Sequence, residues 1–232
     1  MNNYWLPLKK KVHSFFAFLY SQFFNLLAPP FCRNCKIFLK AREIFCSDCS
    51  NKLQPVVSVV LPVTKTKTVK VFAATAYKDP IKRLILAKGW SDISASVQLG
   101  ELIWQRTYVS NVSFDYVLVP IPLHWTRYAK RGYNQAEEIA KTIAQKSGQP
   151  VARLLKRTRR TKFQSDCSVQ ERATNVAEAF EVCCKDLKRY EDKHMILVDD
   201  VMTTGATLKA AAKVIYALKP ASVSALIASR TI

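Results

Sequence analysis

Two adjacent carboxylates and a threonine-rich loop could together hold an anion and the hydroxyl groups beside it. Asp199 and Asp200 end an apolar run that begins at Met195, and this run predicts a buried parallel strand. The loop that follows contains Thr203, Thr204, Gly205, Ala206 and Thr207. Gly205 can adopt a tight turn, and a helix starting near Ala206 would direct backbone N–H groups at the loop. We therefore predict an anion site, with the two carboxylates facing hydroxyl groups or Mg2+.

A structural role for the same residues is the alternative. Asp and Thr side chains commonly cap helices and turns, which accounts for one Asp and one Thr. Capping does not account for a doubled Asp followed by Thr-Thr-Gly-Ala-Thr. Because the chain contains neither a Walker loop nor a Gly-x-Gly-x-x-Gly fingerprint, any phosphate loop must be of another type.

Four cysteines form a second group with chemical potential: Cys32, Cys35, Cys46 and Cys49. They make two Cys-x2-Cys pairs separated by ten residues. Each pair can present two thiolates to one tetrahedral ion, so the spacing predicts a closed structural Zn2+ site. The intervening loop is too short for its own core, and the metal would supply much of the folding free energy. Two disulfides and an iron–sulfur cluster are the alternatives.

The composition points to polyanionic partners. The chain has 232 residues and a net charge of +19, a length that fits one α/β domain with a small appendage. Residues 122–162 contain eleven basic and two acidic side chains, so the excess is concentrated. Nucleic acid, phosphorylated metabolites and an anionic membrane surface would all suit it. No apolar run approaches about 18 residues, so no transmembrane helix is predicted.

Apolar periodicity predicts an α/β fold with a mainly parallel sheet flanked by helices. Strands are expected at 56–60, 68–75, 114–122, 195–200 and 221–228, and helices at 80–87, 93–105, 135–146 and from 206 onward. The basic segment between residues 120 and 135 follows a strand and precedes a helix, which is a second anion-binding geometry around Arg131 and Gly132. A solvated basic turn is the alternative there. His124 is expected to have a structural role.

A basic segment after residue 156 predicts a mobile arm that runs into a short helix at 170–180. Its polar residues are Arg157, Arg159, Arg160, Lys162 and Gln164. Such arms close over polyphosphates or contact nucleic acid, and Phe163 could stack on an unpaired base. An ordinary charged loop is the alternative. Cys167, Cys183 and Cys184 lack metal-ligand spacing and are expected to be buried or half-buried thiols.

Residues 1–28 predict an amphipathic helix with a broad aromatic face. Docking against the core or a partner is the favoured interpretation, with peripheral membrane contact and a signal peptide as alternatives. The expected organisation is therefore an N-terminal helix at 1–28, a four-cysteine zinc module at 29–55 and an α/β domain at 56–232.

The order of these motifs resembles the ComF/GntX family over nearly the whole chain. The matching features are the four cysteines, Pro120-Ile-Pro-Leu-His124, Arg131-Gly-Tyr-Asn-Gln135, the arm motif from Arg157 and the Asp-Asp loop. The loop itself is similar to the phosphoribosyl pyrophosphate (PRPP) loop of type I phosphoribosyltransferases. The chain departs from the family pattern at Trp125, where a proline is common, and at Thr126 and Ala129, where arginines are frequent.

The resemblance implies a type I phosphoribosyltransferase-like domain behind a zinc module. It implies that Asp199 and Asp200 hold the ribose diol, that residues 203–207 wrap the 5'-phosphate, and that Arg131 and Gly132 contact pyrophosphate. PRPP with Mg2+, single-stranded DNA and proteins of the competence machinery are the implied partners. The implied role is DNA handling in natural competence, with an active transferase or a purely interacting zinc protein as alternatives. A cytoplasmic location is implied, with peripheral contact at the inner face of the membrane as the variant.

Overall fold

The structure is a computed structural model that describes residues 29–87, 92–158, 179–183, 186 and 188–232. Contacts divide the chain into two compact units, Met1–Lys52 and Leu53–Ile232. The predicted helix at 1–28 and most of the one at 170–180 lie outside the described residues, as do Arg159, Arg160, Lys162 and Gln164. Those assignments, together with the predicted boundaries at 28 and 55, stay predictions. At the end of the predicted helix at 170–180, Phe180 belongs instead to strand β5, Phe180–Val182.

The smaller unit is built from two short turns that carry the cysteines. In the first turn Phe31 and Phe38 form an antiparallel bridge, and the Cys32 N–H donates to the Ile37 carbonyl at 2.8 Å. The second turn leads into helix α2, Ser47–Asn51. The described part of this unit, residues 29–52, therefore has little regular structure.

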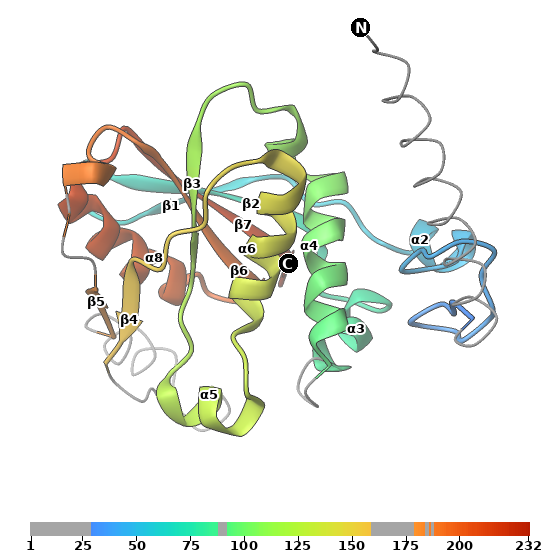
Figure 1. Ribbon diagram of the computed structural model, residues 1–232. Coiled ribbons are helices and arrows are strands. Elements are labelled where there is room, and N and C mark those ends of the chain that lie inside the picture. Colours follow the sequence, from blue (N-terminus) through green and yellow to red (C-terminus); the bar gives the residue numbers. More distant parts are fainter. Residues whose placement is uncertain (1–28, 88–91, 159–178, 184–185, 187) are drawn as a thin grey trace, which may run out of the picture. The chain divides into compact units, whose positions relative to one another are not determined.

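The larger unit contains a five-stranded sheet in the order β1-β2-β7-β6-β3 (Figure 1). Its strands are β1 Val59–Pro62, β2 Thr68–Ala76, β3 Tyr116–Pro120, β6 His194–Met202 and β7 Ser222–Arg230. Strand β1 pairs with β2 antiparallel, and the other neighbours are parallel. The carboxyl ends of β2, β7, β6 and β3 therefore lie along one edge of the sheet, where ligands bind in open α/β folds.

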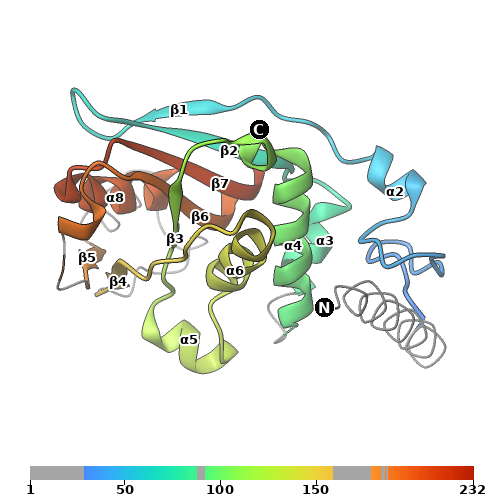
Figure 2. The same ribbon diagram turned by 45° about the horizontal axis from the view of Figure 1, so that its top comes forward.

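Helices cover both faces of this sheet (Figure 2). The α-helices are α3 Ile81–Ala87, α4 Ile93–Arg106, α5 Trp125–Arg131, α6 Gln135–Ser147 and α8 Ala206–Ile215. Short 3-10 turns lie at Tyr108–Asn111, Lys188–Tyr190 and Tyr216–Leu218, and β4 Leu155–Arg157 pairs with β5 Phe180–Val182. Helices α4 and α6 contact one face of the sheet, and α8 contacts the other.

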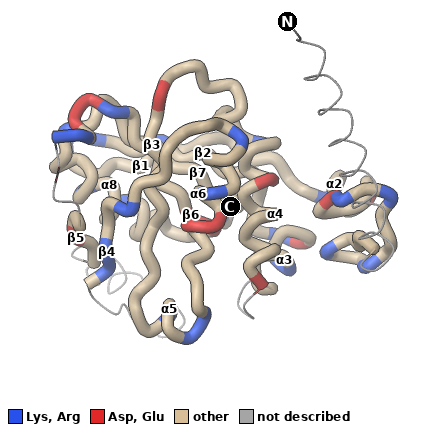
Figure 3. Tube along the Cα trace, in the orientation of Figure 1, with Lys and Arg blue, Asp and Glu red and all other residues tan. Residues whose placement is uncertain are grey.

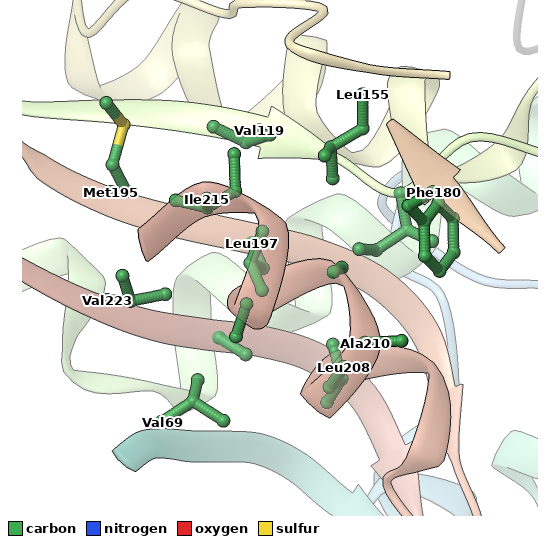
Figure 4. Packing of buried hydrophobic residues seen from close by; sticks show 14 of the residues in the cluster. Val69, Val119, Leu155, Phe180, Met195, Leu197, Leu208, Ala210, Ile215 and Val223 are labelled. Carbon is green, nitrogen blue, oxygen red and sulfur yellow. The ribbon is translucent and has the colours of Figure 1, made fainter. Parts of the chain in front are cut away.

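Side-chain alternation along β6 explains why both faces are covered. Met195 and Leu197 belong to the buried cluster beneath α8 (Figure 4). Ile196 and Val198 are equally buried but do not belong to that cluster. Because successive strand residues point to opposite faces, these two project toward α4 and α6. The continuous apolar run that predicted a buried parallel strand is thereby explained.

The predicted mixed α/β fold with a mainly parallel sheet is confirmed, with local differences. Strand β1 starts three residues later than the predicted 56–60, because its register is fixed by pairing, with Val59 opposite Val71. The predicted strand at 114–122 is shorter, Tyr116–Pro120. The segment expected to be an irregular basic turn contains α5. The start of the predicted arm, Arg157, belongs to β4.

Gly100 lets α4 approach α6 closely, and a methyl group there should be costly. A Cβ at this position would lie 2.7 Å from Thr142 Cβ and 3.0 Å from the Ile139 carbonyl oxygen. We expect Gly100→Ala to lower the free energy of unfolding by about 1–2 kcal/mol, since overpacking outweighs the gain in helix propensity. Denaturant unfolding measures this. Gln105→Ala, on the exposed side of the same helix, should stay within about 0.5 kcal/mol of the wild type. An unchanged midpoint for Gly100→Ala would contradict the packing argument.

Candidate functional site

The two carboxylates lie near the carboxyl end of β6, on opposite faces of the strand. Asp200 is buried and Asp199 is half-buried. Asp199 Oδ1 accepts a hydrogen bond from the Asp200 backbone N–H at 2.8 Å. On the side of α6, Gln135 Nε2 donates to Asp200 Oδ2 at 3.4 Å. Since neighbouring strand residues point to opposite faces, the pair presents two separate carboxylates to the edge of the sheet.

The threonine loop joins β6 to α8 as the sequence predicts. Thr203 and Thr204 are exposed, whereas Gly205 is buried and adopts a left-handed φ of 77° directly before α8. The Ala206 N–H donates to Thr204 Oγ1 at 3.4 Å. The loop therefore offers exposed hydroxyl groups at the N-terminal end of a helix, which is favourable for an anion.

Gly205 is required for a second reason, which only the fold reveals. A Cβ at this position would lie 2.5 Å from Leu61 Cδ1, at the end of a side chain from β1. The left-handed φ already disfavours any other residue. The edge strand β1 therefore packs directly behind the loop and fixes its path.

The second predicted anion-binding segment forms α5 and its caps. His124 is buried and caps the helix, with its Nδ1 accepting from the Thr126 N–H at 3.4 Å, so the predicted structural role of this histidine is confirmed. Gly132 ends the helix with a φ of 78°, and its N–H donates to the Tyr128 carbonyl at 2.7 Å. Arg131, the last residue of α5, is half-buried. Its contact with pyrophosphate stays a prediction.

Arg157 links the start of the predicted arm to the carboxylates. Its guanidinium lies over the Phe180 ring, 5.4 Å from the centroid. Burial lowers the pKa of Arg157, the charge of Arg127 lowers it further, and the charge of Asp199 opposes both. Arginine stays protonated at neutral pH despite such shifts. The Arg157 guanidinium group on β4 therefore lies within electrostatic reach of both the Asp199 carboxylate and the Arg127 guanidinium group on α5.

Sequence reasoning missed two of these neighbours as site residues. Arg127 lies in the basic segment that was predicted to be a second anion-binding geometry, with a solvated basic turn as the alternative, but it was not named as a site residue. Gln135 was predicted as the start of a helix and as part of the family motif. Their positions in the sequence could have identified them. Both residues follow β3, and parallel strands bring the segments after β3 and β6 to the same edge of the sheet. Figure 3 shows basic residues along α5 and β4 and an acidic stretch at the end of β6.

The four predicted metal ligands come together in the smaller unit. The sulfur atoms of Cys32, Cys35, Cys46 and Cys49 all lie within 4.8 Å of one another. Tetrahedral zinc thiolates need sulfur–sulfur distances of about 3.8 Å, and Cys35 Sγ lies 3.6 Å from Cys46 Sγ. Asn34 Nδ2 donates to Cys49 Sγ at 3.2 Å. The cluster is compatible with a zinc site, and Asn34 supports one of its ligands.

The thiol pKa values show that the surrounding turns already favour negative charge. Burial opposes ionisation of Cys32, but backbone N–H groups of both cysteine turns outweigh it and lower the pKa of this thiol to about 6. The Ile37 N–H favours the Cys35 thiolate, yet desolvation and the neighbouring sulfur atoms raise its pKa to about 11. The sulfur atoms thus compete with one another for ionisation, and a divalent cation removes that competition.

Cys183 was predicted to be buried or half-buried, and that prediction is wrong. It is exposed, directly after β5, and its Sγ donates to the Arg153 carbonyl at 3.1 Å. The two-stranded β4–β5 ladder is too short to cover the residue that follows it. Cys167 and Cys184 lie outside the described residues.

Within the described ranges, no helix combines the length and the apolar character needed to span a bilayer.

Comparisons with known proteins address the same region of the chain. The family model described as "Phosphoribosyl transferase domain" matches residues 129–229, which include α6, β6, the threonine loop, α8 and nearly all of β7. The chain is 31% identical to Competence protein F of Haemophilus influenzae over 102 residues, which cover 44% of each chain. It is 37% identical to Competence protein ComFC of Bacillus subtilis over 112 residues, 47% of this chain and 42% of the relative.

A third relative extends this group to proteins named for DNA use. The DNA utilization protein YhgH of Escherichia coli is 30% identical over 116 residues, 50% of this chain and 49% of the relative. The chain therefore spans about half the length of the curated relatives it matches. The domain match coincides with the α/β unit that holds the carboxylates, and the similarity to competence proteins agrees with the family resemblance of the motifs. The chain therefore contains a phosphoribosyltransferase domain and is similar, over about half of its length, to competence proteins F and ComFC.

Proposed function

We propose that the protein binds PRPP, or a related ribose phosphate, at the carboxyl end of β6 and acts in handling single-stranded DNA during natural competence. One observation supports the choice of a ribose phosphate as the ligand. Two carboxylates end a central parallel strand, and a threonine loop with an obligatory glycine then enters α8, all within the matched phosphoribosyltransferase domain. A ribose phosphate offers hydroxyl groups to the carboxylates and a phosphate to the loop.

Each part of the ligand has a proposed partner. Asp199 and Asp200 would accept hydrogen bonds from the ribose hydroxyl groups. The backbone N–H groups and hydroxyls of residues 203–207 would hold the 5'-phosphate at the N-terminus of α8. Arg131 and the Gly132 backbone would contact the pyrophosphate. The charges of Arg127 and Arg157 support an anion on the same side of the crevice.

Two metal ions have separate places in this proposal. Asp199 and Asp200 offer oxygen ligands of the kind Mg2+ prefers, and Mg2+ bound with PRPP would supply charge neutralisation of the pyrophosphate. The four cysteines fit a closed Zn2+ site, which would supply folding free energy to the smaller unit and no reaction chemistry.

The DNA half of the proposal is supported by charge and by the relatives. The net charge of +19 suits a polyanion, and the matched relatives are named as competence and DNA utilization proteins. Proteins of the competence machinery would be partners. The place of action would be the cytoplasm, at the inner face of the membrane where incoming strands arrive.

An active phosphoribosyltransferase is the second candidate. Arg157, which interacts with Asp199, and Arg127, which interacts with Arg157, favour it, because guanidinium groups suit a departing pyrophosphate. In that reaction the bond from the anomeric carbon to pyrophosphate breaks and pyrophosphate leaves with the electron pair. An acceptor nucleophile forms the new bond to that carbon and loses its proton. No described residue identifies the acceptor.

Calorimetric titration with PRPP and Mg2+, run beside an assay for pyrophosphate release, tests both candidates. We expect saturable binding of PRPP, weaker binding of ribose 5-phosphate, and no release above the protein-free rate in the absence of an acceptor. Repeating the release assay with oligothymidylate and with free bases separates a binding protein from an enzyme. Absence of any binding heat at millimolar PRPP would refute the ligand assignment.

A further inference from the structure

Helix α5 exposes two aromatic side chains that do not contribute to the core. Trp125 is 70% exposed and Tyr128 is 50% exposed. They are three residues apart, so they share one face of the helix. None of the residues of α5, every one of which the structure describes, is buried. The helix is fixed by its caps, His124 and Gly132. Trp125 makes a tilted ring contact with His124, with 5.7 Å between the ring centroids, and both aromatic side chains stay exposed to solvent.

Cations flank this aromatic face. Helix α5 carries Arg127, Lys130 and Arg131 and has no acidic residue. Tyr128 lies within electrostatic reach of Arg153, and Arg127 lies within reach of Arg157. Two guanidinium groups that repel each other are stabilised when an anion lies between them. The surroundings of the aromatic face therefore suit a ligand with regularly spaced negative charges.

Exposed aromatics among cations match the chemistry of unpaired nucleotides. Proteins that bind single strands combine aromatic side chains, on which bases stack, with basic groups that follow the phosphates. Bases inside a duplex are already stacked and cannot use such a surface. Trp, Tyr and Arg are also enriched at protein interfaces, but three cations without an acidic residue on one short helix favour a polyanion.

We infer that the Trp125–Tyr128 face of α5 is a stacking surface for the bases of single-stranded nucleic acid, with the neighbouring arginines contacting its phosphates. The inference deepens the proposed function and rests on it for the choice of a single strand as ligand. The inference places the strand near the proposed ribose-phosphate site. Arg127 of α5 and Asp199 of that site both interact electrostatically with Arg157.

Binding of a fluorescently labelled oligothymidylate to the full-length chain tests the inference. A strand of about 15 nucleotides suffices, measured by anisotropy at low salt. We expect Trp125→Ala with Tyr128→Ala to weaken binding by at least about tenfold. The single substitution Trp125→Phe, with Tyr128 unchanged, should keep most of the affinity for the strand. Phe114→Ala is the matched control, because Phe114 is a 45% exposed aromatic at the amino end of β3.

An abasic strand of equal length separates stacking from charge. It keeps the phosphates, so the double variant and the wild type should bind it equally, and calorimetric affinity for PRPP should be unchanged. Equal losses for the abasic and normal strands would overturn stacking. If the wild type and the double variant bind the normal strand equally tightly, the inference is wrong, but the proposed role in DNA handling is not affected. The exposed face of α5 would then be a candidate contact for a protein partner. If the wild type binds no strand, the inference and the DNA half of the proposed function fail together, and PRPP binding is judged by calorimetry alone.

Discussion

Replacing Asp199 and Asp200 together with Asn is expected to weaken PRPP binding by roughly a hundredfold or more, with the fold retained. Charge-assisted hydrogen bonds contribute about 1.5–3 kcal/mol each, so two lost carboxylates give an effect of this size. Asparagine keeps an Oδ1 that can still accept from the residue 200 backbone N–H and from Gln135 Nε2, the partners of the carboxylates. Calorimetry with PRPP and Mg2+ measures the loss.

The direction in which the affinity for PRPP changes distinguishes two arrangements of the ligand at the carboxylates. If the carboxylates hold hydroxyl groups or a cation, as proposed, their neutralisation weakens binding. If instead a phosphate lay directly against them, neutralisation would remove repulsion and strengthen binding. Asp115→Asn is the matched control, because Asp115 is an exposed carboxylate just before β3, at the opposite edge of the sheet. Unchanged affinity in a folded Asp199→Asn, Asp200→Asn protein would place the ligand elsewhere.

The sheet could be predicted because its signals are local. Strand β6 is a run of buried apolar residues with two carboxylates near its end, and its neighbours β3 and β7 have the same apolar character. The loop after β6 was equally readable, since Gly205 and the threonines stand together in the sequence. A pattern of this kind needs no knowledge of the rest of the chain.

What could not be predicted depends on tertiary contacts. Helix α5 has no buried residue and hence no apolar periodicity, so only its caps, His124 and Gly132, marked it. The hydrogen bond from Gln135 to Asp200 joins residues 65 positions apart. The contact between Leu61 and Gly205 likewise depends on how β1 pairs. The opposite faces taken by Asp199 and Asp200, by contrast, follow from strand periodicity and could have been predicted from the sequence.

Replacing Cys49 with Ser is expected to release the metal and unfold the smaller unit while the larger unit keeps its fold. Within the described part of the smaller unit, residues 29–52, the buried apolar residues other than cysteine are Ile44 and Phe45. Burying such side chains contributes about 1.5–3 kcal/mol each. Ordering the backbone costs about 1–2 kcal/mol per residue, so two side chains cannot offset it. Zinc bound by four thiolates contributes about 10–16 kcal/mol, which is the magnitude required.

Metal analysis measures the loss of zinc, and limited proteolysis measures the unfolding of the smaller unit. The wild type should hold one zinc per chain, and Cys49→Ser should hold none and be cleaved rapidly between residues 29 and 52. The thermal transition of the larger unit should persist, because contacts divide the chain at Lys52 and Leu53. Cys183→Ser is the control, since this exposed thiol lies outside the cluster and should leave the zinc in place. Iron in the wild type, or thiols that stay unreactive after chelation because they are disulfide-bonded, would overturn the zinc assignment. Rapid cleavage of the wild type at full zinc occupancy would show that the metal does not order this unit.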